Sequence, residues 1–193
     1  MYMSKLQLKK TRGCWEEKDI ISSLKYLTIN IGISLGNKWF TPENTLKLIK
    51  WVLNHSDQKV IFNIVDTIHV ITTEFIEKIS REKAVEYVKT MVDDFMYQLQ
   101  PLIKVELTEE ERGRIVYTTW SDVVTPEYQL QVNFLYEYYE NNNEFKDMIH
   151  GFVHNYIARK GIIYSSQDIH KLGFYIIEEL PEITARVPIA GIV

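Results

Sequence analysis

The sequence lacks several features that would place it in a specialised class of protein. Its 193 residues include one cysteine, Cys14, so the chain cannot close an internal disulfide, which fits a reducing compartment. No apolar run approaches the roughly 20 residues that span a membrane, and the first ten residues contain no apolar stretch of signal-peptide length. We therefore expect a cytoplasmic protein that does not associate with membranes.

Motifs for nucleotide cofactors and metal ions are also missing. No G-x-G-x-x-G follows an expected strand, and G-x-x-x-x-G-K-[ST] does not occur, so no cofactor is expected. His150 and His154 lie four residues apart, but Gly151 stands where a metalloprotease carries glutamate, and no third ligand presents itself. We interpret this spacing as a coincidence on a helix face and expect no metal. His55 and His69 have no motif around them.

The composition is that of an ordinary globular chain, with 46% hydrophobic and 25% charged residues. This length fits a single domain over residues 1–193. Apolar, β-branched strand patterns alternate with capped helical patterns, which predicts an α/β fold: one Rossmann-like domain with a central, mostly parallel sheet flanked by helices. The expected strands cover 26–33, 59–65 and 114–120, and the expected helices follow Thr41-Pro42 and cover 73–100, 126–140, 144–160 and 167–180.

The first expected strand leads into Gly32-Ile33-Ser34-Leu35-Gly36, which matches the G-x-S-x-G pattern. Thr41 and Pro42 then predict a helix start, since threonine is a favoured N-cap and proline fits the first helical position. A strand, a serine between glycines and a helix are typical of a nucleophile elbow. The pattern alone also fits a structural turn.

An α/β-hydrolase is the first enzyme class that this serine suggests, but the rest of the chain does not fit it. The triad of that fold follows in the order serine, acid, histidine. His170 is the only histidine after residue 154, and it lies early on an expected helix. A serine can still act as a nucleophile without a strong base when the acyl donor is an activated ester. We keep the hydrolase as a less favoured alternative.

Two further groups of side chains are candidates for a site. Tyr175 and Glu179 lie four residues apart on the last expected helix, so they share a face and can hold and deprotonate an amine. The alternative is a packed tyrosine beside a solvated glutamate. A set of basic residues fits either an RNA-backbone site or a salt-bridged solvent face, because acids are interleaved with it. The set comprises Lys78, Arg81, Lys83 and Lys89.

The segment Ile31–Asn37 with Phe40-Thr41, followed by Tyr175-x-x-x-Glu179-Leu-Pro, resembles the cyclodipeptide synthase family over nearly the whole chain. Members of that family resemble the catalytic domain of class I aminoacyl-tRNA synthetases without its ATP-handling motifs. They convert two aminoacyl-tRNAs into a 2,5-diketopiperazine. The resemblance implies a tRNA-dependent aminoacyltransferase that works by ping-pong acyl transfer, as a monomer without cofactor or metal.

The resemblance also assigns roles to residues. Ser34 is similar to the family nucleophile, which carries an aminoacyl and then a dipeptidyl ester. Tyr175 and Glu179 are similar to the pair that anchors the amino group, with the glutamate as proton acceptor. Five residues either are similar to substrate-binding positions of the family or are expected near the specificity pockets. They are Gly32, Ile33, Asn37, Val65 and Tyr128. Asn37 places the chain nearer the subfamily with asparagine there, and Glu182 either favours a polar substrate or points to solvent.

Two departures from the family pattern keep a second hypothesis open. The family carries another catalytic tyrosine downstream of the Glu-Leu-Pro helix, whereas this sequence stops at Pro188–Val193, so it is either truncated or lacks that tyrosine. The basic tract after Lys78 is mixed in charge, whereas family members often carry a strongly basic helix. The alternative function is a non-catalytic Rossmann-like protein that binds tRNA or another ligand.

Overall fold

The computed structural model describes residues 22–161 and 164–185, except for the side chains of Val65 and of residues 182–185. The expectations for residues 1–20, for the Glu182 side chain and for the end at 188–193 lie outside that part. Contacts between Cα atoms group the chain into two compact units. The first comprises residues 1–65, 90–119 and 187–193, and the second comprises 66–89 and 120–186. The single domain expected over 1–193 stays a prediction.

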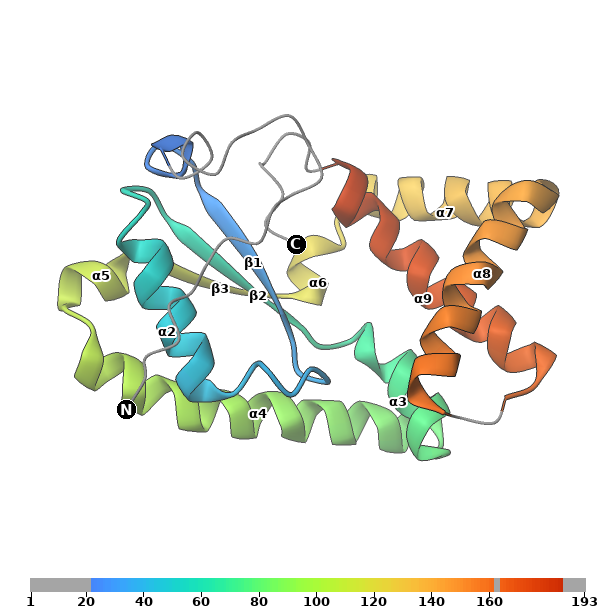
Figure 1. The fold of residues 1–193 in the computed structure, drawn as a ribbon, viewed down its shortest axis with the longest axis horizontal. Helices are drawn as coiled ribbons and strands as arrows, with labels where there is room; N and C mark the ends of the chain where they lie inside the picture. The colour runs from blue at the N-terminus through green and yellow to red at the C-terminus, as the bar shows by residue number, and fades with distance from the viewer. Residues whose placement is uncertain (1–21, 162–163, 186–193) are drawn as a thin grey trace. The chain divides into compact units, whose positions relative to one another are not determined.

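The first unit contains a parallel sheet in the order β1-β2-β3 (Figure 1). β1 is Ile29–Ser34, β2 is Val60–Val65 and β3 is Ile115–Thr119. Ile29 pairs with Val60, which pairs in turn with Ile115, so the strands begin in register. These bounds confirm the α/β class and the parallel sheet that the sequence predicts.

One face of this sheet packs against helices α2 (Pro42–Leu53) and the later part of α4 (Arg81–Glu106). Alternate residues of β1 point into this core, because successive side chains of a strand point to opposite faces. Burial of each such side chain stabilises the fold by about 1.5–3 kcal/mol. The buried core residues from β1, α2, β2 and α4 include Ile29, Ile31, Ile33, Leu46, Ile49, Val52, Val60, Phe62, Phe95, Leu99 and Ile103.

The second unit is helical over its described residues. It contains α3 (His69–Glu77), residues 81–89 of α4, α6 (Trp120–Val123), α7 (Pro126–Asn141), α8 (Asn143–Lys160) and α9 (Ser166–Ala185). α7, α8 and α9 pack around Tyr139, Ile149 and Ile177, all of which are buried.

Side-chain caps fix the starts of several helices, as the sequence predicts. The Thr41 hydroxyl accepts a hydrogen bond from the backbone N–H of Asn44 at 3.2 Å, and Thr125 makes the same bond to Tyr128. Each cap satisfies one N–H that has no partner inside the helix. Gly161 ends α8 with a φ of 63°, a left-handed conformation that favours glycine.

The long helix expected over 73–100 is wrong in two respects. It is broken between α3 and α4, where Lys78 adopts a φ of 53° without any glycine or proline to signal the break. α4 then continues through Pro101 to Glu106, and α9 likewise continues through Pro181 to Ala185. In α4, the apolar face continues into the core after the proline, at Ile103, and this packing outweighs the loss of one backbone hydrogen bond.

Candidate functional site

Ser34 is the last residue of β1 and pairs in register with Val65, the last residue of β2. Ligands of parallel sheets bind at this carboxyl edge. The backbone N–H of Asn37 donates to the Ser34 carbonyl oxygen at 3.0 Å, which closes a tight turn directly after the serine. The local order of strand, serine, turn and capped helix is therefore as expected from the sequence.

The residues next to Ser34 differ in whether their side chains stabilise the turn, lie in the core or are absent. The Asn37 side-chain oxygen accepts a hydrogen bond from the Trp39 N–H at 3.0 Å, so this side chain stabilises the turn. The Ile33 side chain is fully buried in the core, so a substrate contact by this residue would involve its backbone. Gly36 has neither a left-handed φ nor any atom within 4 Å of an added Cβ, so the turn does not require glycine there.

Tyr175 and Glu179 lie together on α9 in the second unit. The Tyr175 hydroxyl donates a hydrogen bond to a Glu179 carboxylate oxygen at 2.7 Å, and both side chains are largely buried. Burial raises the pKa of Glu179 above its ordinary value, and the hydrogen bond from Tyr175 offsets part of that rise. Burial and the nearby Glu179 charge also raise the pKa of Tyr175, which therefore remains a neutral donor. A carboxylate with a raised pKa accepts a proton more readily than an ordinary one.

His69 belongs to the same cluster, although the sequence analysis found no motif around it. Its ring stacks on the Tyr175 ring, with centroids 6.5 Å apart and 25° between the planes. Burial lowers the pKa of His69, and the nearby Asp66 carboxylate opposes that shift. His69 therefore packs mainly as a neutral ring. The signal in the sequence is the segment Asp66–His69 directly after β2, since polar residues at a strand's carboxyl end commonly serve a site.

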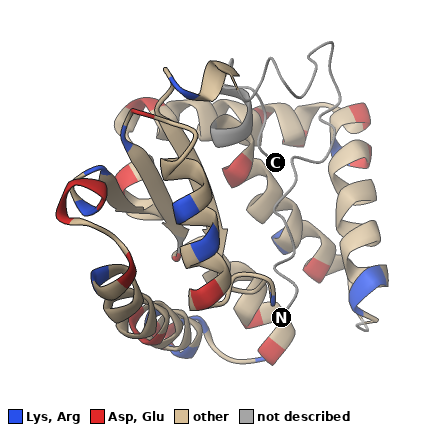
Figure 2. Ribbon diagram, turned by 60° about the vertical axis from the view of Figure 1, so that its left-hand side comes forward, with Lys and Arg blue, Asp and Glu red and all other residues tan. Residues whose placement is uncertain are grey.

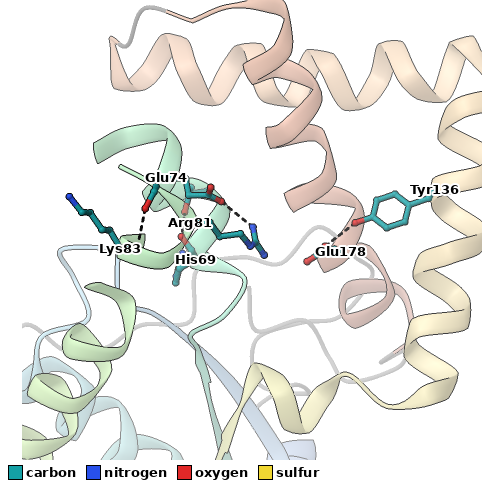
Figure 3. Close-up of polar contacts among 8 residues, drawn as sticks. His69, Glu74, Arg81, Lys83, Tyr136 and Glu178 are labelled. Carbon is teal, nitrogen blue, oxygen red and sulfur yellow. Dashed lines mark hydrogen bonds and ion pairs between the residues drawn. The ribbon is translucent and has the colours of Figure 1, made fainter. Parts of the chain in front are cut away.

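Two tyrosines of α7 hold the neighbouring glutamate of α9. The Tyr128 hydroxyl donates to the Glu178 backbone carbonyl oxygen at 2.6 Å. The Tyr136 hydroxyl donates to the Glu178 carboxylate at 2.9 Å, as Figure 3 shows. Tyr128 is 8% exposed. The structure thus gives Tyr128 a contact that positions α9, and its expected role in substrate binding stays a prediction. Neither Tyr136 nor Glu178 was expected at the site, because no short-range pattern links residues 42 apart.

The four basic residues do not form one uniform positive surface. Arg81 makes an ion pair with Glu74 at 3.0 Å, with the side chains directed at each other (Figure 3). Lys78 lies in the break between α3 and α4, and Lys83 and Lys89 are exposed on α4. Acidic and basic residues are interleaved along α4, and Figure 2 shows both charge types on the ribbon. This arrangement agrees with the salt-bridged interpretation for Arg81, and an RNA contact by the others stays a prediction.

One cavity lies in the second unit and has a volume of about 760 Å³. Its lining combines cations and acids, so it has no single charge preference. The charged lining residues are Glu74, Lys78, Arg81, Asp168, Lys171 and Glu178. Glu178 and Arg81 also line a smaller cavity of about 380 Å³, together with Trp120 and Tyr128.

The described residues contain no group of three or more His, Cys, Asp or Glu that could hold a metal ion. His150 Nε2 instead lies 2.7 Å from the Tyr139 hydroxyl, and His154 Nδ1 lies 3.3 Å from the Tyr164 hydroxyl. Within 22–161 and 164–185, no helix is long and apolar enough to cross a membrane.

Several of the known structures that match this chain are cyclodipeptide synthases. AlbC from Streptomyces noursei is 22% identical, with a TM-score of 0.64 over 84% of this chain and 77% of AlbC. A cyclodipeptide synthase from Fluoribacter dumoffii is 18% identical, with a TM-score of 0.64 over 79% of this chain and 68% of its own. A Mycobacterium tuberculosis protein, whose structure relates cyclodipeptide synthetases to type I tRNA synthetases, is 16% identical. Its TM-score is 0.64 over 86% of this chain and 68% of its own. No protein-family model and no curated protein sequence matches the chain. The chain therefore shares the fold of these enzymes.

Proposed function

We propose that this protein is a tRNA-dependent cyclodipeptide synthase. The observation that carries the proposal is the fold that it shares with cyclodipeptide synthases over about four fifths of its length. The position of Ser34 at the carboxyl end of β1 and the hydrogen-bonded Tyr175–Glu179 pair support the proposal. The sequence resemblance assigns catalytic roles to the same three residues.

In the first step, the Ser34 hydroxyl attacks the ester carbonyl of an aminoacyl-tRNA. A new ester to serine forms, the ester to tRNA breaks, and the serine proton leaves with the released tRNA hydroxyl. The exchange of one ester for another needs no external energy source, because the activation already present on tRNA is retained. Backbone N–H groups of the turn after Ser34 are suitable donors for the transient oxyanion.

In the second step, the amino group of the aminoacyl-Ser34 ester attacks the carbonyl of a second aminoacyl-tRNA. Tyr175 and Glu179 anchor that amino group, and Glu179 accepts its proton as the amide bond forms. The ester bond to the second tRNA breaks, and Glu179 passes the proton to the released tRNA hydroxyl. The raised pKa of Glu179 suits this role, since a base works best when its pKa approaches the working pH. The free amine of the dipeptidyl ester then attacks the Ser34 ester, which closes the six-membered ring and releases the serine.

Contacts to tRNA are proposed for the basic residues that make no ion pair with another described residue. Lys83 and Lys89 are exposed on α4, whereas Arg81 pairs with Glu74. We propose that the enzyme acts as a monomer in the cytoplasm, where charged tRNA is available. Size-exclusion chromatography with light scattering tests the monomer, and a dimer would contradict it.

The proposal is tested by expressing the full chain in a bacterium and measuring diketopiperazines in the medium by mass spectrometry. We expect a new diketopiperazine mass, its loss in Ser34→Ala, and its retention in the control Ser121→Ala, which alters an exposed serine. Purified protein mixed with aminoacyl-tRNA should gain one aminoacyl mass on Ser34. Normal product from Ser34→Ala would contradict the mechanism. Binding of tRNA without product would favour the non-catalytic alternative, and hydrolysis of a simple ester through Ser34 would favour the hydrolase.

A further inference from the structure

The face of the sheet that carries Ser34 is opposite to the core face. In β1, the residues Asn30, Gly32 and Ser34 alternate with the buried isoleucines that pack against α2 and α4. Gly32 pairs in register with Asn63 of β2, and Asn63 pairs with Thr118 of β3. Since paired residues of neighbouring strands project to the same side of a sheet, Ser34 and Asn63 share a face.

Asn63 is a buried polar residue whose hydrogen-bonding capacity is not fully used. The residue is 2% exposed, and its side-chain oxygen, Oδ1, has no hydrogen-bond partner. A buried acceptor without a partner costs roughly 1–3 kcal/mol, and such groups are uncommon in native proteins. An acceptor kept in this state at a substantial energetic cost is well suited to receive a donor from a ligand.

Gly32 leaves the position beside Asn63 without a side chain. Ser34 follows two residues further along β1, so its Cα lies about 8 Å diagonally from that of Asn63, given the usual rise and spacing of strands. An amino acid esterified to Ser34 bridges much of this distance when its side chain is long, as in tyrosine, glutamine or tryptophan. The row formed by Gly32 and Asn63 therefore lies within reach of that side chain.

We propose that Asn63 Oδ1 accepts a hydrogen bond from the side chain of the first amino acid held on Ser34, and that it selects a neutral donor there. Hydroxyl, amide and indole N–H groups meet this requirement. An ammonium does not, because the described side chains on this face carry no acid to pair with it, and burial of an unpaired charge is costly. The other described side chains on the face are Asn30, Ile61, Val116 and Thr118.

This inference rests on the proposed function, because it concerns the acyl group on Ser34. The test mixes the purified full chain with each of the twenty aminoacyl-tRNAs and follows the aminoacyl mass on Ser34. We expect the fastest loading from an amino acid with a neutral side-chain donor. We expect that tRNA to load at least about tenfold faster than its closest apolar counterpart, such as tyrosyl against phenylalanyl, because a site built to bind a donor rejects the analogue that lacks it.

Asn63→Leu removes the acceptor while nearly keeping the volume. We expect this variant to lose the preference for the donor and to melt at or above the temperature of the wild type, since an apolar group replaces an unsatisfied amide. Asn54→Leu makes the same change at an exposed position and should leave the preference unchanged.

The outcomes separate the two proposals. Loading of Ser34 that is fastest with apolar amino acids, or a donor preference that survives in Asn63→Leu, overturns the role of Asn63 and leaves the cyclodipeptide synthase intact. If no aminoacyl-tRNA loads wild-type Ser34, the proposed function fails and the inference about Asn63 fails with it. If Asn63→Leu does not fold, the comparison of paired aminoacyl-tRNAs on the wild type still decides the question.

Discussion

The Tyr128 hydroxyl donates a hydrogen bond to the backbone carbonyl oxygen of Glu178, 50 residues later in the chain, at 2.6 Å. The contact joins α7 to α9 beside the turn of helix that carries Tyr175 and Glu179. Because the bond is made to the backbone, it constrains the position of α9 whatever the rotamer of Glu178.

Tyr128→Phe removes this hydrogen bond and keeps the buried ring. We expect the free energy of unfolding to fall by about 0.5–1.5 kcal/mol, which for a chain of this size lowers the melting temperature by a few degrees. Differential scanning calorimetry measures the change. Tyr97→Phe, at a residue that is 81% exposed, is the control and should change the free energy by less than about 0.5 kcal/mol. If both variants lowered the free energy of unfolding by the same amount, the hydrogen bond from Tyr128 would make no stabilising contribution of its own.

Glu179→Gln should stabilise the protein at neutral pH while abolishing synthesis. Folding raises the pKa of Glu179, so the native state binds its proton more tightly than the unfolded state does. The stability that comes from this residue is therefore complete below the ordinary carboxyl pKa of 4.5 and is lost as the pH rises through the folded pKa. We expect a higher melting temperature than wild type at pH 7.5 and little difference at pH 4. The exposed control Glu137→Gln should show no such pH dependence, and destabilisation by Glu179→Gln at pH 7.5 would contradict the raised pKa.

The cluster of Tyr139, His150 and His170 should make the second unit less stable in mild acid. Tyr139 is fully buried and its hydroxyl lies 2.7 Å from His150 Nε2 and 3.3 Å from His170 Nδ1. Burial lowers the pKa of His150, with Asp147 opposing the shift, so folding favours the neutral ring. The corresponding stability is complete above the unfolded pKa near 6.5 and is lost as the pH falls through the lower folded pKa.

We therefore expect the melting temperature to fall between pH 7.5 and pH 5.5, and the fall to be smaller in His150→Gln. His154→Gln, one turn further along α8 at an exposed position, should retain most of the wild-type dependence, because burial contributes more than His154 to the lowered pKa of His150. A fall of the same size in wild type and His150→Gln would assign the effect to other groups.

Lys78→Gly should stabilise the protein, although it removes a side chain. Lys78 adopts a φ of 53°, where a Cβ costs roughly 1–2 kcal/mol and glycine does not pay this penalty. We expect a net gain of about 1 kcal/mol in the free energy of unfolding, measured by urea denaturation. The matched change Lys83→Gly lies inside α4 and should instead cost about 1 kcal/mol. If Lys78 also contacts tRNA, the stabilised variant will bind tRNA more weakly and with a shallower salt dependence.

Much of the framework follows from local sequence. The β-branched runs before Ser34 and Asp66 and the threonine–proline pairs at 41–42 and 125–126 each carry their own signal, and the structure places strands and helix starts accordingly. The spacing of Tyr175 and Glu179 likewise suffices to predict one shared helix face. The spacing does not show whether the hydroxyl and the carboxylate form a hydrogen bond. The structure shows this bond, with a distance of 2.7 Å between the two oxygens.

Other features depend on contacts between distant segments. Lys78 is not a usual left-handed cap, and the local sign of a break there is Ser80, whose hydroxyl accepts a hydrogen bond from the Lys83 N–H at the start of α4. Pro101 and Pro181 each predict a helix end, yet α4 and α9 both continue past them. In α4, the continuation packs Ile103 into the core. The role of Glu178 is set by two tyrosines on another helix, 42 and 50 residues earlier, and no pattern along the chain reveals it.

The hydrogen bond from Tyr136 to Glu178 also affects which glutamate of α9 pairs with Tyr175. Tyr175 has two glutamates within helical reach, Glu178 at i+3 and Glu179 at i+4, and either spacing allows a side-chain contact. Tyr136 engages the Glu178 carboxylate, so Tyr175 pairs with Glu179 alone. A chain that lost the phenol at position 136 would keep both glutamates but would lose the discrimination between them. A residue on α7 thus holds one of two chemically identical neighbours, and the other, Glu179, is the one proposed above as the base.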